Sequence, residues 1–199
     1  MKFSEEQKLI VLMLCDVMKV LESKGNEISF DPSFIESAVC SGHSWGIPMK
    51  YHLFKGEPLP KNVNEVFCIL EMWRQIESAI FQLSSVEQEE IKKEYPKTKF
   101  PGFDGNEESE QFNIAHFIID NLKRFDEFKG RDLNTHYPII GCYQRMLVVF
   151  EALGALPQKE GKCQKNRHNI KNMLCLREIH SKPRKGTFPC IQYYQVYPN

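Results

Sequence analysis

Apolar residues recur every three or four positions along most of this chain, which is the spacing of amphipathic α-helices. The first such segment follows Ser4, where Ser4 and Gln7 predict a capping box that satisfies backbone amides at a helix start. Gly25 predicts the end of this helix. Its apolar positions are Leu9, Leu12, Met13, Val17, Val20 and Leu21.

Two further start signals predict helices in the first half of the chain. Asp31 followed by Pro32 is typical of a helix N-terminus, and this short helix is expected to end at Gly42. Asn62 or Asn64 is expected to cap the longest helix, which carries one continuous apolar face. The residues of that face are Val66, Ile69, Leu70, Trp73, Ile76, Ile80 and Leu83.

A link and two shorter elements are predicted around the longest helix. Residues 43–48 are expected to form an irregular link, followed by a turn of helix at 50–54. Ser85 and Gln88 repeat the capping-box spacing and predict a short helix. This helix is expected to end before Tyr95, because a residue that precedes proline is disfavoured in the helical region.

The stretch 100–153 is the most individual part of the sequence. It begins with a tight Phe-Pro-Gly-Phe-Asp-Gly turn, whose two phenylalanines are expected to anchor it to the core. Asn106 is expected to cap the next helix, with Glu107 and Glu108 in the first turn, where the helix dipole favours negative charge. The apolar pattern extends this helix as far as Gly130.

A last helix is predicted from Ile139 to Leu153. Five or six helices without a convincing alternating strand pattern predict an all-α class, a multi-helix domain with bundle-like packing. Residues 189–197 differ because their residue types are β-prone. For this segment a late strand and an extended arm stay open as alternatives.

The charge distribution divides the chain into two parts. Residues 156–199 hold nine basic and two acidic residues, for a net charge of +7. Residues 1–155 hold 17 basic and 24 acidic residues, for a net charge of −7. We therefore predict a helical domain at 1–155 and an irregular basic extension at 156–199.

Hydropathy and cysteine usage predict a cytoplasmic protein without a membrane span. No apolar run approaches the roughly 18 residues that cross a bilayer. The N-terminus is acidic where a signal peptide would be basic. The seven cysteines form an odd set, and Cys15, Cys68 and Cys142 lie within apolar helical patterns, which is typical of free cysteines in a reducing compartment.

Three motifs carry a resemblance to a known family: the turn at 100–105, the Tyr-Gln-Arg-Met-Leu run at 143–147, and the Ser-x-x-Gln-Lys-Leu-Ile segment at 4–10. The helix around 65–73 adds to it. Over residues 3–155 the chain resembles the YfbU-like family of bacterial proteins, while residues 42–60 and the basic extension depart from the family pattern. The resemblance implies a helical, soluble protein and assigns it no catalytic residue and no cofactor.

Two groups of side chains could support chemistry. The carboxylates of Asp104, Glu107 and Glu108 are oxygen ligands of the kind that bind divalent cations, but turn and helix-start roles explain them as well, and we favour those roles. His116 and Asp120 lie four residues apart on one helix face, where a carboxylate can orient an imidazole. We favour a histidine at the edge of the core there, because His116 lies beside apolar positions.

The basic extension holds potential zinc ligands at Cys163, His168, Cys175 and His180. Their spacing, with four residues inside each pair, is not a common zinc-finger pattern, so no metal or other cofactor is predicted. The sequence also lacks a Gly-x-Ser-x-Gly nucleophile motif and the glycine motifs that bind phosphates.

We predict an interaction or regulatory protein that works through its surfaces, with a homo-oligomer or another protein as partner. The predicted helices at 63–83 and 139–153 carry large apolar residues, Trp73, Phe81 and Phe150, beyond what a small bundle needs inside. The hypothesis of an enzyme that uses Asp104, His116 and Asp120 is supported by residue type alone.

The alternative hypothesis is nucleic-acid binding by the basic extension. Its cations would contact phosphates and its tyrosines would stack on bases. A solvated surface that complements the acidic domain explains the same charges, and we favour that interpretation. The candidate phosphate contacts are Lys162, Lys165, Arg167, Lys171, Arg177, Lys182, Arg184 and Lys185.

Overall fold

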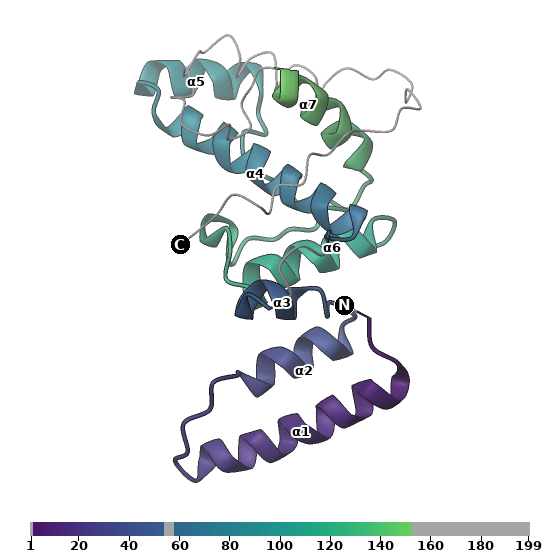
Figure 1. Cartoon of the computed structure of the whole chain (residues 1–199). Helices are drawn as coiled ribbons and strands as arrows, with labels where there is room; N and C mark the ends of the chain where they lie inside the picture. Colours follow the sequence, from purple (N-terminus) through teal and green to yellow (C-terminus); the bar gives the residue numbers. More distant parts are fainter. Residues whose placement is uncertain (1, 54–57, 153–199) are drawn as a thin grey trace.

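The protein is all-α in the computed structural model, which describes residues 2–53 and 58–152 (Figure 1). The predicted fold class is therefore confirmed. No helix within these two ranges has both the length and the apolar composition that a membrane crossing requires. The elements are α1 (Glu5–Ser23), α2 (Pro32–Cys40), α3 (Gly46–Tyr51), α4 (Lys61–Phe81), α5 (Ser85–Glu94), α6 (Ser109–His116), a π-helical turn (Phe117–Asn121), a 3-10 turn (Asp126–Phe128) and α7 (Ile140–Ala152).

Helix α4 is the centre of the fold. It packs against both α6 and α7, and Figure 1 shows it crossing the molecule between them. Every residue from Val66 to Trp73 is buried, and all of them except Glu71 are apolar, which is typical of a helix in a protein interior. The Trp73 ring contacts the rings of Phe100 and Tyr143, each with a centroid distance of 6.1 Å.

The Phe-Pro-Gly-Phe-Asp-Gly turn is anchored to this core, as the sequence predicts. Phe100 and Phe103 are 3% and 0% exposed. The Tyr143 hydroxyl donates a hydrogen bond to the Gly102 carbonyl at 2.7 Å, and the Phe103 N–H donates to the Leu133 carbonyl at 2.9 Å. Gly102 has φ +94°, and a Cβ on it would lie 1.7 Å from the Leu133 oxygen, so no larger residue fits.

Glu108 connects this turn to the last helix. Its side chain is almost fully buried, and one carboxylate oxygen accepts hydrogen bonds from the Ile139 and Ile140 N–H groups at 2.6 Å each. The other oxygen accepts from the Asp104 N–H at 3.1 Å. Since Ile140 begins α7 and Ile139 directly precedes it, the carboxylate satisfies amides that a helix start leaves without a partner.

The predicted start of α6 is therefore wrong. The sequence predicts Asn106 as the cap, but the N-cap residue is Glu108 and α6 begins at Ser109. The Asn106 N–H instead donates to the Asp104 carboxylate at 3.0 Å, within the preceding turn. A buried carboxylate requires hydrogen-bond donors around it, and two of the donors to Glu108 lie 31 and 32 residues away, so this requirement is not visible in the local sequence.

The predicted continuation of this helix to Gly130 is also wrong. Helix α6 ends at His116 and passes into the π-helical turn, after which Lys123 and Phe125 have positive φ angles of 53° and 57°. Phe125 still packs on the core, and Phe128 is fully buried. Phe125 and Phe128 therefore reach the core because the chain bends after α6, and not because a straight helix continues.

Helix boundaries elsewhere match the predictions at some ends and differ at others. The Asp31 carboxylate caps α2 by accepting the Phe34 N–H at 3.0 Å, as predicted. Helix α5 has its capping box at Ser84 with Glu87, one residue earlier than predicted. Helix α4 follows Pro60 without a side-chain cap, and α3 begins at Gly46, inside the predicted irregular link.

Replacement of Glu108 by alanine should strongly destabilise the fold. Three buried or half-buried N–H groups would lose their acceptor, which costs about 1 kcal/mol each, so we expect the free energy of unfolding to fall by about 3 kcal/mol. Urea denaturation measures this change. Glu107→Ala is the matched control, since Glu107 is exposed, and an equal loss in both variants would contradict the assigned role of Glu108.

A pair of glycine substitutions tests the close approach at the turn. Gly102 and Gly130 both have positive φ, but a Cβ at Gly130 would meet nothing within 4 Å. Gly130→Ala should therefore cost about 1 kcal/mol of stability from the backbone conformation alone. Gly102→Ala should cost several times more, because the Leu133 backbone must move, and similar thermal denaturation midpoints for the two variants would contradict this packing.

Candidate interaction surface

Helix α1 lies at one end of the molecule and packs against α2, which separates it from the rest of the chain in Figure 1. The side of α1 that faces α2 is closed: Cys15 is 2% exposed, and Val11 and Leu12 are partly buried. An ion pair between Lys19 and Glu36 joins the two helices, and this hydrogen bond raises the pKa of Lys19. Helix α1 is thus held along one side.

The opposite side of α1 is apolar and open to solvent. Seven large apolar side chains on it are between 44% and 60% exposed. Single exposed apolar residues are normal, but a contiguous row of them on one helix is typical of an interaction site. We call this row the apolar stripe, and it consists of Leu9, Ile10, Met13, Leu14, Val17, Val20 and Leu21.

Both ends of α1 are defined by local sequence, as predicted. The Ser4 hydroxyl accepts the Gln7 N–H at 3.2 Å, and the Gln7 side chain accepts the Ser4 N–H at 2.9 Å, which completes the capping box. Gly25, with φ +82°, follows the C-terminal end of the helix. These signals fix the first and last residues of the helix that carries the apolar stripe.

Helix α2 fastens α1 to the body of the molecule. Its Phe34 is 4% exposed, and the Phe34 ring lies 5.8 Å from the ring of Phe117 between centroids. The Tyr51 hydroxyl accepts the Asp31 N–H at 2.8 Å at the start of α2. The α1–α2 pair therefore presents the apolar stripe on a support that is itself packed on the core.

Surplus apolar surface was expected on α4 and α7, and the structure bears this out for one of the three named residues. Trp73 of α4 and Phe150 of α7 are fully buried within the chain, whereas Phe81 of α4 is 82% exposed. The uninterrupted apolar run from Leu9 to Cys15 indicates that α1 carries apolar side chains on more than one side. A helix that is apolar on all sides has more than one face to cover, and α2 covers just one of them.

The side chains considered for chemistry have local partners. Asp104 is 3% exposed and its carboxylate accepts the Asn106 N–H, while His116 Nδ1 lies 3.1 Å from the Asp120 carboxylate. The His116 and Asp120 side chains are 38% and 49% exposed, so they form a surface pair. Within the described ranges no hydrogen bond joins Asp104 to this pair.

The described residues around Asp104, Glu107 and Glu108 do not build a metal site. Among them, no group of three His, Cys, Asp or Glu side chains is arranged to hold a metal ion. The carboxylate of Glu108 is occupied by backbone amides. Three groups of residues lie outside the described ranges, so the structure does not test the hypotheses about them. They are the β-prone segment 189–197, the potential zinc ligands Cys163, His168, Cys175 and His180, and the candidate phosphate contacts Lys162, Lys165, Arg167, Lys171, Arg177, Lys182, Arg184 and Lys185.

Comparison with known proteins identifies the family. Residues 1–180 match a family model described as the YfbU domain. The chain belongs to the YfbU family. The match includes every helix from α1 to α7, and it continues past residue 155, where the sequence predicts a domain boundary.

A curated protein that is similar to part of this YfbU chain is UPF0304 protein MJECS11 of Methanocaldococcus jannaschii. The two are 30% identical over 63 residues, which is 29% of this chain and 38% of the relative. The match thus spans less than half of the relative's length. No solved structure matches the chain.

His43 is a half-buried titratable group that packs against Phe117, the residue that Phe34 of α2 also contacts. Its ring lies 4.7 Å from the Phe117 ring and 5.7 Å from the Trp45 ring between centroids. Burial among these rings lowers the pKa of His43 from 6.5, and the negative charge of Glu110 opposes this effect. The folded state therefore favours neutral His43.

This preference predicts a pH dependence of stability. In the unfolded chain His43 takes up a proton near pH 6.5, whereas in the folded chain it does so at lower pH. Its contribution is fully present above pH 6.5 and is lost as the pH falls from there toward the folded pKa. Urea denaturation should show a smaller loss between pH 7.5 and pH 5 for His43→Gln than for the wild type, and equal losses would contradict this assignment.

Proposed function

We propose that this protein is an interaction protein that binds a helix of another protein chain through the apolar stripe of α1. The observation that carries this proposal is the exposure of seven large apolar side chains on one side of one helix. Removal of such a surface from water is favourable by roughly 25 cal/mol per Å². A helix that packs on the stripe would gain this free energy without any rearrangement of the core.

The site favours a helical partner over a small ligand. A single helix surface has ridges and grooves that accept the side chains of a second helix, whereas small-molecule sites are concave and enclosed. The stripe also lacks charged side chains between Leu9 and Leu21 on its exposed side, apart from Asp16 at its margin. Association by apolar packing is thus the chemistry that this surface supports.

Photo-crosslinking in cells that express the protein tests this proposal. A photoreactive amino acid in place of Met13 lies within the stripe, and we expect it to form a discrete crosslinked species with a protein chain. Glu5 is the control position, because its side chain is 84% exposed but lies outside the stripe on the same helix. The same crosslinking pattern at both positions would contradict a specific interaction through the stripe.

A further inference from the structure

The stripe has the spacing of a coiled-coil seam, and the seam ends in opposite charges. Steps of four and three residues alternate along it, which is the repeat that packs one helix along another. Charged residues take the first and last seam positions and apolar residues the four between them. The seam positions are Glu6, Ile10, Met13, Val17, Val20 and Lys24.

This seam is complementary to itself in one direction. If a second α1 runs antiparallel about a two-fold axis near Cys15, Ile10 of each copy faces Val20 of the other, and Met13 faces Val17. The same rotation places Glu6 opposite Lys24 at both ends. A two-fold interface requires this reciprocity, in which residue i contacts residue j and residue j contacts residue i.

We propose that the occupant of the apolar stripe is a second copy of this chain, packed antiparallel along α1 with Glu6 of each copy paired to Lys24 of the other. This proposal rests on the proposed function, because it names the partner of the same surface. The result is a symmetric dimer in which α1 lies between its own α2 and the α1 of the second copy.

Charge decides the direction of packing. In a parallel pair Glu6 would face Glu6 and Lys24 would face Lys24, so both ends would repel. In the antiparallel pair both ends attract. The Ser4 hydroxyl donates to the Glu6 carboxylate at 2.6 Å and lowers the pKa of Glu6.

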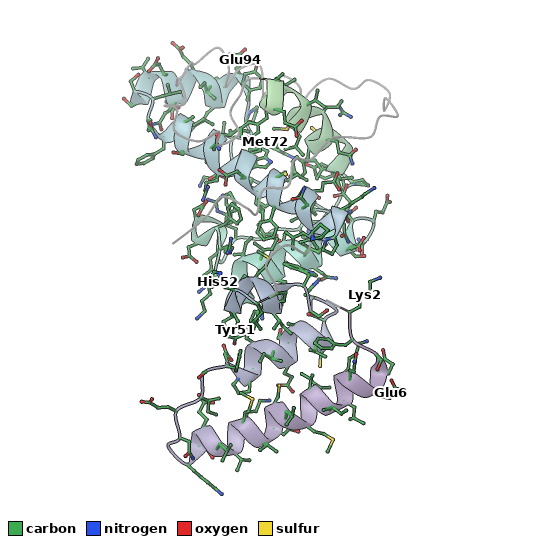
Figure 2. The ribbon with its side chains drawn as sticks, in the orientation of Figure 1. Lys2, Glu6, Tyr51, His52, Met72 and Glu94 are labelled. Carbon is green, nitrogen blue, oxygen red and sulfur yellow. The ribbon has the colours of Figure 1, made fainter. Side chains whose placement is uncertain are left out.

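The position of α1 in the fold leaves room for this arrangement. Helix α2 packs on the opposite side of α1, and Figure 2 shows Glu6 at the N-terminal end of the helix. Leu9, Leu14 and Leu21 flank the seam and widen the apolar contact. Asp16 lies at the margin of the stripe near the two-fold axis. Repulsion between the Asp16 carboxylates of the two copies would weaken the dimer.

Light scattering of the full chain over a wide range of concentration measures the association. We expect a dimer mass for the wild type and a monomer mass for Met13→Glu, with affinity reduced roughly a hundredfold or more by an unpaired charge in the seam. Met13 is 60% exposed in the single chain, so circular dichroism should show unchanged helicity. Asp16→Asn should strengthen the dimer, because it removes the repulsion at the axis.

A charge exchange tests the direction. Glu6→Lys and Lys24→Glu should each weaken the dimer about tenfold, since each places like charges at both ends. The double variant Glu6→Lys with Lys24→Glu should restore the wild-type affinity, because opposite charges face each other again. Glu5→Lys, on the same turn but outside the seam, is the control for effects on the helix dipole.

Two results would overturn the second copy as the occupant. A monomer mass at every concentration, or a dimer that Met13→Glu leaves intact, would exclude this interface. In that case, a crosslink from position 13 to a different protein would support the proposed function and contradict the dimer. A crosslink from position 13 to another part of the same chain would contradict both proposals. Failure of the double charge variant to restore affinity would overturn the antiparallel direction.

Discussion

The carboxylate of Glu108 is the contact on which the arrangement of the second half of the chain depends. Its two oxygens accept three backbone N–H groups, one from the aromatic turn at Asp104 and two from the start of α7 at Ile139 and Ile140. A buried carboxylate is stable only when such donors surround it. Glu108 therefore holds α6, the turn and α7 in one geometry, and this geometry encloses α4.

The core around α4 follows from that enclosure. Tyr143 of α7 donates to the Gly102 carbonyl in the turn, and the Tyr143 ring packs against Trp73. Because Gly102 lies against the Leu133 backbone, the turn has no space to relax if a neighbouring element shifts. The most distinctive motifs of the sequence, the aromatic turn and the Tyr-Gln-Arg-Met-Leu run, thus act as structural contacts that close the core.

The α1–α2 pair is constructed differently. Helix α1 has one closed side against α2 and one open apolar side, and Cys15 is its one buried residue, so its local stability depends on the contact with α2 and on a good capping box. Regions with few buried contacts open more easily than the core. A partner on the apolar stripe would stabilise this end of the molecule by mass action, since it would bind the folded helix alone.

Local sequence determined the all-α class, the caps at Ser4 and Asp31, and the last helix to within one residue, because short-range hydrogen bonds and helical periodicity need no distant partner. The tertiary structure decided what Glu108 binds, where α6 ends and which side of α1 stays open. Each of these depends on groups that are far apart in the chain: Glu108 meets amides 31 and 32 residues away. The run from Leu9 to Cys15 predicts a helix with too much apolar surface, but only the packing of α2 shows which face is left for a partner.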